Sequence, residues 1–117
     1  MTQAAPTLKV TVDLPEPLPS LPAPLVHLCL RFLPESVTNS IKYAGASSFA
    51  FRLTWHGQEI QLCAEDNGCV ENLSRARNGF SSLRQRVEDL GGTFHAAVAL
   101  NQPVRLHACL PVLPGAL

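Results

Sequence analysis

Apolar and polar residues alternate in the run Leu-Lys-Val-Thr-Val-Asp-Leu at positions 8–14. A period of two is typical of a strand with one buried face, so this run predicts the first strand of a sheet. The proline-rich run 15–24 follows it. Because proline neither donates to a strand ladder nor continues a helix, this run predicts an extended connection.

The next pattern predicts a long helix that begins at Ser20 or Pro24 and ends near Ala44, where Gly45 is a natural C-cap. Pro34 lies inside it and removes one helical hydrogen bond. The helix either kinks there, or a second helix begins with Pro34 in its first turn. The apolar positions, three to five apart, are Leu25, Leu28, Phe32, Val37 and Ile41.

The remaining pattern predicts a hairpin, a second helix and two more strands. In order, we expect strands at 48–55 and 59–64 around a turn at 56–58, a polar turn at 65–68, a loop at 69–78, a helix at 79–90 and strands at 93–100 and 104–110. The order β-α-β-β-α-β-β predicts an α/β fold, an α+β sandwich in which a mixed sheet of about five strands carries helices on one face. We expect a single domain over 1–117, with tails at 1–6 and 113–117.

Composition narrows the class of partner. Nine basic and nine acidic side chains give a net charge of zero, which argues against nucleic acid as a partner. The most apolar run, 24–33, contains His27 and Arg31 and is far shorter than the roughly 20 residues of a membrane span. We therefore expect no membrane contact by this chain and a cytoplasmic location, which includes the cytoplasmic part of a larger membrane-bound protein.

Four cysteines occur, at Cys29, Cys63, Cys69 and Cys109, without a C-x-x-C pair or a regular spacing. Two of them fall in apolar runs. This distribution favours buried free thiols in a reducing compartment over a disulfide framework or a zinc site.

A polar group lies on the long predicted helix. Glu35 and Asn39 are four residues apart and therefore stack on one face, with Lys42 one turn further on. A carboxylate, a carboxamide and an ammonium group could together hold a hydrated cation and phosphates. A solvated helix face explains the same residues, just as a simple tight turn explains Asn67-Gly68.

Three blocks of the sequence together resemble the ATP-binding catalytic domain of sensor histidine kinases, of the GHKL superfamily. The stretch 35–46 (E-S-V-T-N-S-I-K-Y-A-G-A) is similar to the family's asparagine box, and Asp66-Asn67-Gly68 to its first glycine box. The stretch 78–92 (N-G-F-S-S-L-R-Q-R-V-E-D-L-G-G) resembles the second glycine box and its helix, in the form that nitrate-sensor kinases have. The resemblance covers about residues 8–112 and implies the ATP-binding sandwich of that family.

The resemblance also implies roles for individual residues. Asn39 would coordinate a magnesium ion that bridges the ATP phosphates, and Glu35 would be the catalytic residue that orients a metal-bound water or acts as a base. Asp66 would accept a hydrogen bond from the adenine amino group. Gly68 would let the backbone approach the base, and Gly79 would open a helix whose amides face phosphate.

The nucleotide-binding set implied by the resemblance is Asn39, Lys42, Tyr43, Asp66, Gly68, Arg77, Gly79 and Phe80. Lys42, with Arg77 or Arg84, would neutralise phosphate charge. The implied cofactors are ATP and Mg²⁺. The implied partner is a histidine-containing dimerisation domain of the same parent protein, with a response regulator as an indirect partner.

The sequence departs from the family pattern at several positions. Val70 and Arg77 stand where the family has glycines, Pro34 stands where arginine or glutamine is usual, and 101–105 lacks the usual Gly-Thr pair. None of the four histidines lies in a phospho-accepting box. Three functions therefore stand side by side: a kinase ATP-binding domain, a degenerate module kept for regulation or protein–protein contact, and an anti-sigma-type serine kinase.

Overall fold

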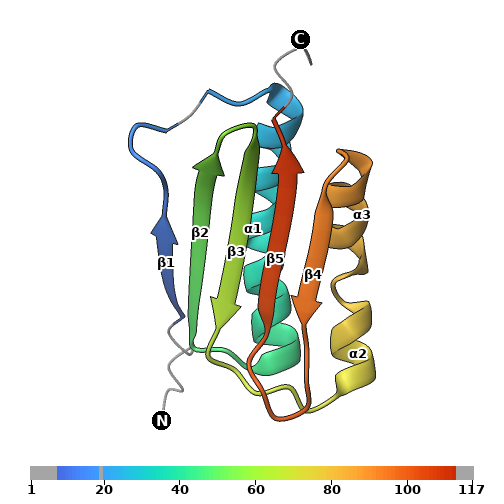
Figure 1. Cartoon of the computed structure of the whole chain (residues 1–117). Coiled ribbons are helices and arrows are strands. Elements are labelled where there is room, and N and C mark those ends of the chain that lie inside the picture. The colour runs from blue at the N-terminus through green and yellow to red at the C-terminus, as the bar shows by residue number, and fades with distance from the viewer. Residues whose placement is uncertain (1–7, 19, 113–117) are drawn as a thin grey trace.

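The chain folds as one layer of helices on one layer of sheet (Figure 1). The computed structural model describes residues 8–18 and 20–112. The predicted tails, 1–6 and 113–117, lie outside that range. The elements are β1 (Lys9–Asp13), α1 (Ala23–Ala44), β2 (Ser48–His56), β3 (Glu59–Asp66), α2 (Leu73–Asn78), α3 (Ser81–Asp89), β4 (Thr93–Ala97) and β5 (Arg105–Pro111).

The sheet has the strand order β1-β2-β3-β5-β4. β1 and β2 are parallel and are joined through α1, whereas the other neighbours are antiparallel. β1 forms one edge, and α2 and α3 lie toward the other edge, beside β4 (Figure 1). The predicted class, a mixed five-stranded sheet with helices on one face, is confirmed.

α1 is one helix that continues through Pro34. It begins after Pro22, with Pro24 in its first turn, where the missing proline N–H removes no helical bond. It ends at Gly45, whose φ of 61° is the left-handed conformation that glycine adopts without strain. The proposed second helix starting at Pro34 is therefore wrong.

The buried side of α1 changes character halfway along the helix. Leu25, Leu28 and Phe32 are buried as expected, but Val37 is only half-buried and Ile41 is 49% exposed. The buried positions that follow Phe32 are instead serines, Ser36 and Ser40, together with Ala44. The Ser36 hydroxyl donates to the Phe32 carbonyl one turn earlier, so this buried polar group is satisfied inside the helix itself.

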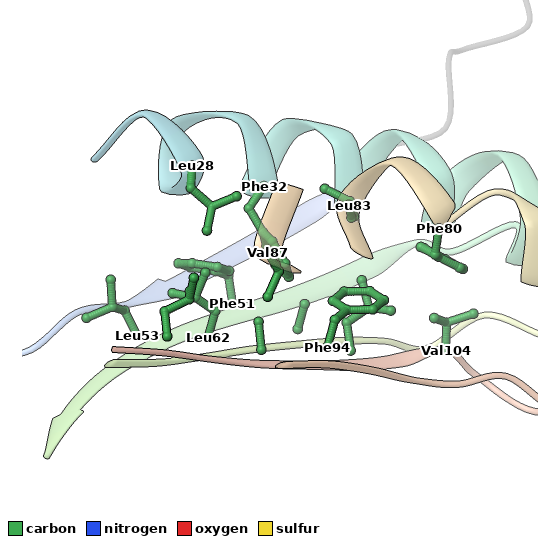
Figure 2. Packing of buried hydrophobic residues seen from close by; sticks show 14 of the residues in the cluster. Leu28, Phe32, Phe51, Leu53, Leu62, Phe80, Leu83, Val87, Phe94 and Val104 are labelled. Carbon is green, nitrogen blue, oxygen red and sulfur yellow. The ribbon is translucent and has the colours of Figure 1, made fainter. Parts of the chain in front are cut away.

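The core fills the space between the two layers (Figure 2). The ring of Phe32 is fully buried, with its centroid 6.2 Å from that of Phe51 on β2 and 6.3 Å from that of Phe94 on β4. Leu83 and Val87 add the apolar side of α3 to the same cluster. The helix layer and the sheet are thus held together by one continuous apolar contact.

The segment between β3 and α3 differs from the prediction. Glu65 and Asp66 extend β3, so the polar turn expected at 65–68 begins only at Asn67. The expected loop at 69–78 contains the short helix α2, which Asn72 caps by accepting the backbone N–H of Arg75 at 3.0 Å. Gly79 ends α2, and α3 begins at Ser81, not at Gly79.

The cysteines are free thiols, but none of the four is fully buried: Cys69 is exposed and the other three are half-buried. The expectation of buried thiols is therefore wrong. Partial burial still raises the pKa of the Cys29 thiol, and it is the main reason why the pKa of the Cys63 thiol is raised. Among the described helices, none combines the length and the hydropathy that crossing a bilayer requires.

Candidate functional site

Asp66 carries a buried oxygen that has no hydrogen-bond partner. The residue ends β3 and is 5% exposed. Its Oδ1 accepts the backbone N–H of Gly68 at 2.9 Å and that of Val104 at 3.0 Å, whereas Oδ2 is buried and unpartnered among the described residues. An unsatisfied buried acceptor is rare and unfavourable. The residues that the structure describes thus leave room for a further donor at this oxygen.

The second half of α1 turns its polar side chains toward the segment that follows β3. The Asn39 amide nitrogen donates to the Gly79 carbonyl at 2.9 Å. Glu35 forms an ion pair with Arg86 of α3, with 3.2 Å between Oε1 and Nη2. The predicted pair Glu35 and Asn39 thus lies on one side of α1, next to α3. The amide oxygen of Asn39, the atom that a magnesium ion would take, is not used by the contact with Gly79.

Arg86 is a residue of this site that the sequence did not single out. Its pairing with Glu35 engages Nη2, while its Nε is buried without a partner among the described residues. Its side chain is 36% exposed and that of Glu35 is 32% exposed. The available signal was its place in the block 78–92, but nothing in that block says which side chain of α1 it meets.

The ring of Tyr43, on α1, packs against Gly79, the residue that follows α2. A Cβ atom placed on Gly79 would lie 2.1 Å from Cε2 of Tyr43, so only glycine allows the ring to lie there. The Tyr43 ring also meets Phe80 edge-on, at 6.2 Å between centroids. Lys42 Nζ and the Arg75 guanidinium lie 5.5 and 5.7 Å from the Tyr43 centroid. Two cations therefore gather around this ring.

A pocket of about 290 Å³ opens beside these two cations. It is lined by Ile41, Lys42, Tyr43, Ala44, Gly45, Cys69, Glu71, Asn72 and Arg75. Neither Asp66 nor Asn39 belongs to its lining. The structure therefore brings Lys42 and Tyr43 to an open pocket, but it keeps Asp66 buried and Asn39 in contact with Gly79.

The remaining predicted residues lie in different surroundings. Gly68 packs against the end of α1, where an added Cβ would stand 2.3 Å from the Ala44 carbonyl oxygen. Arg77 is exposed on α2, and Phe80 is buried in the core at 2% exposure. Arg84 donates to the Phe94 carbonyl at 3.1 Å, and its guanidinium lies over the Phe94 ring.

Val70 stands where the sequence pattern that the chain resembles has a glycine. It is fully buried and bridges to Leu100, with its N–H bound to the Gln102 carbonyl at 3.0 Å and its carbonyl bound to the Asn101 N–H at 2.8 Å. This position has become part of the core. It anchors the start of the loop to the segment that joins β4 and β5.

No protein-family model matches the chain. Among solved structures, it is similar to a blue-light activated histidine kinase of Erythrobacter litoralis, at a TM-score of 0.72 and 19% identity over 91% of the chain. The structure of the histidine kinase domain of that protein matches with a TM-score of 0.69 and 19% identity over 91% of the chain. The histidine kinase AdeS of Acinetobacter baumannii gives 0.65 and 16% over 92%.

The chain spans only part of these neighbours: 36% of the Erythrobacter kinase, 52% of its kinase domain and 55% of AdeS. At 16 to 19% identity the likeness concerns the fold, and the fold agrees with the one that the three sequence blocks imply. The chain has the mixed-sheet α/β fold that is present in these histidine kinases.

Proposed function

We propose that this chain is the ATP-binding catalytic domain of a two-component sensor histidine kinase, of the nitrate-sensor type that its sequence blocks resemble. The observation that carries the proposal is the Oδ2 of Asp66, which is buried and finds no hydrogen-bond partner in the described part of the chain. An exocyclic amine, such as that of adenine, is a donor that would satisfy this carboxylate through a charge-assisted hydrogen bond. The backbone bonds to Oδ1 hold the carboxylate rigidly for that purpose.

The groups around α1 suit the rest of Mg-ATP. The amide oxygen of Asn39 is the hard ligand type that magnesium prefers, and the carboxylate of Glu35 lies one turn away for a water of the ion. Lys42 and Arg75 provide positive charge at the pocket for phosphate oxygens. A bound magnesium ion would offset the charge of the phosphates during transfer, which in such reactions depends on positioning and electrostatics.

The acceptor belongs to another domain in this proposal. All four histidines of the chain, His27, His56, His95 and His107, are exposed, and none stands in a phospho-accepting sequence. We infer that the chain presents Mg-ATP to a histidine on a dimerisation domain of the same parent protein, from which a response regulator receives the phosphoryl group. This work would take place in the cytoplasm, without contact between this chain and nucleic acid or membrane.

A second candidate is a non-catalytic module with the same fold. The contacts of Tyr43 and Asn39 with Gly79 favour it, because both already occupy the side of α1 that a nucleotide would need. The replacement of glycines by Val70 and Arg77 favours it as well. Such a module would serve regulation or protein–protein contact.

Calorimetric titration with a non-hydrolysable ATP analogue, with and without magnesium, distinguishes the kinase domain from the non-catalytic module. Asp66→Asn is the decisive variant, because it keeps the oxygen that Gly68 and Val104 use and replaces the free oxygen with a donor. We expect magnesium-dependent binding that Asp66→Asn weakens more than about tenfold, since two donors then face each other. Asn39→Ala should remove only the magnesium dependence.

The neighbouring Glu65→Gln, on an exposed side chain, is the matched control and should bind as the parent does. Absence of both heat and a thermal shift at about 1 mM nucleotide would overturn the kinase proposal, because that limit corresponds to less than about 4 kcal/mol of binding. The non-catalytic module would then be the better description.

A further inference from the structure

β1 exposes a row of apolar side chains. Val10 and Val12 pair with Phe49 and Phe51 of β2 and therefore point to the same side of the sheet as those buried rings. Yet Val10 is 43% exposed, Val12 46% and Leu14, just after the strand, 47%. Every residue of β1 is exposed, because the helix layer does not extend over this edge (Figure 1).

The outer edge of β1 also has unused backbone groups. The Lys9 N–H donates to the Ser47 carbonyl, at the start of β2, at 3.0 Å. In a parallel pair alternate residues point their backbone groups toward the same neighbour, so Thr11 and Asp13 also face β2. Val10 and Val12 therefore point their N–H and C=O groups outward, where no strand of the described chain pairs with them. Such an edge is a template for another strand.

The sequence of this edge is complementary to itself. Read around Thr11, the run 8–14 is Leu-Lys-Val-Thr-Val-Asp-Leu, which is symmetric in its apolar positions and opposite in its charges. If two copies pair antiparallel with Thr11 opposite Thr11, Val10 lies opposite Val12 on the apolar face. Lys9 then lies opposite Asp13 on the other face. This is also the register in which the outward-pointing residues Val10 and Val12 are the hydrogen-bonded pair.

We propose that β1 binds the β1 of a second copy of this chain, antiparallel and centred on Thr11. The two-fold contact joins the two sheets into one, with the helix layers on the same side. Reciprocal backbone bonds between Val10 and Val12 hold the edges together, and two Lys9–Asp13 pairs flank them. Asp13 already pairs with Arg52 at 3.0 Å, through Oδ2, so its other oxygen is the one that Lys9 of the second copy meets.

The association should be weak. One short strand and its side chains form a contact well below the roughly 1,200 Å² of stable interfaces, so we expect a Kd on the order of tens of micromolar. The contact lies on the edge of the sheet away from α2 and α3, and none of the residues proposed to bind the nucleotide belongs to β1 (Figure 1). A chain that binds no nucleotide would still associate in this way.

Sedimentation equilibrium of the full chain, from about 10 µM to about 1 mM, tests the proposal with two charge variants. Lys9→Glu places acid opposite Asp13, and Asp13→Lys places base opposite Lys9. Each should weaken self-association roughly tenfold, because like charges then lie directly opposite each other on both sides of the axis. An equimolar mixture of the two variants should associate as the parent does, because every pair is again opposite in charge.

Val12→Pro removes an outward backbone donor without removing a bond to β2, and proline is tolerated at such edges. We expect it to be monomeric with an unchanged circular dichroism spectrum, whereas the matched variant Val12→Ala keeps the donor and should retain some association. A parent chain that stays monomeric to about 1 mM would overturn the proposal. So would single charge variants that associate as strongly as the parent, and this holds even if Val12→Pro fails to fold.

Discussion

The two halves of α1 belong to one unbroken helix, but they are specified by different physics. The first half buries Leu25, Leu28 and Phe32 against the sheet. The second half buries Ser36 and Ser40 and turns Asn39 and Tyr43 toward the segment after β3. An apolar stripe holds the first half in place, whereas small side chains and hydrogen bonds hold the second.

The difference shows how one helix combines a structural half with a half that carries the candidate site. The first half requires large apolar side chains, because they fill the space between the helix layer and the sheet. The second half requires the backbone of the following segment to come close to the helix, because Gly68 and Gly79 pack directly against it. Truncating a buried side chain of the first half should therefore lower the free energy of unfolding strongly. In the second half, the loss should depend on which contact the substitution disturbs.

The largest effect is expected at Phe32. Its ring is fully buried and contacts the rings of Phe51 and Phe94, so Phe32→Ala should lower the free energy of unfolding by about 3–5 kcal/mol. Urea denaturation measures this change. Leu30→Ala on the same half of the helix is the control, since Leu30 is 68% exposed and should change stability by less than about 0.5 kcal/mol. A similar loss in both variants would contradict the assigned role of the first half.

An intermediate effect is expected at Gly79. Gly79→Ala forces the new methyl group against the Tyr43 ring, 2.1 Å from Cε2, and should destabilise the fold by about 1–3 kcal/mol. Adding Tyr43→Ala removes the obstacle, so the double variant should lose less than the sum of the two single variants. Thermal unfolding of the four chains of this cycle provides the comparison. Additive losses would mean that Tyr43 does not rest on Gly79 in solution.

The smallest effect is expected at Ser36. Within residues 8–18 and 20–112, its hydroxyl bonds only the Phe32 carbonyl, which the helix already satisfies, and alanine is the better helix former. Ser36→Ala should therefore change the free energy of unfolding by no more than about 0.5 kcal/mol, although the site is fully buried. A loss above about 2 kcal/mol would show that this hydroxyl has a further partner.

The same contrast explains how much the sequence predicted. Periodicity found the β2–β3 hairpin and the first half of α1, because those residues are chosen for burial on one face. It also found β1, but the buried face that the alternation predicts there is wrong, since every residue of this strand is exposed. The same pattern placed Val37 and Ile41 on the buried side of α1, but neither is fully buried. A pattern of apolar residues cannot identify serines as the buried positions of a helix. The residues buried in this half are instead Ser36, Ser40 and Ala44, all with small side chains.

The sequence predicted the residues of the candidate site, but not their contacts in the folded chain. The sequence blocks placed Glu35, Asn39 and Asp66 in one region, and the structure has the first two on one side of α1. The partners of these residues were not predictable, because Arg86, the Gly79 carbonyl and the Val104 N–H come from distant positions. The free oxygen of Asp66, on which the proposed function depends, follows from burial in the folded chain.

The two glycines that the loop retains would be needed even in a chain that never met a nucleotide. Gly68 lies against the Ala44 carbonyl and Gly79 against the Tyr43 ring, so any larger residue would push the loop away from α1. Glycine at these two positions is therefore explained by folding alone, whereas the buried carboxylate of Asp66 has an oxygen for which the described residues give no hydrogen-bond partner. The two glycines of this chain are therefore no evidence for nucleotide binding, which the Asp66 variant tests instead.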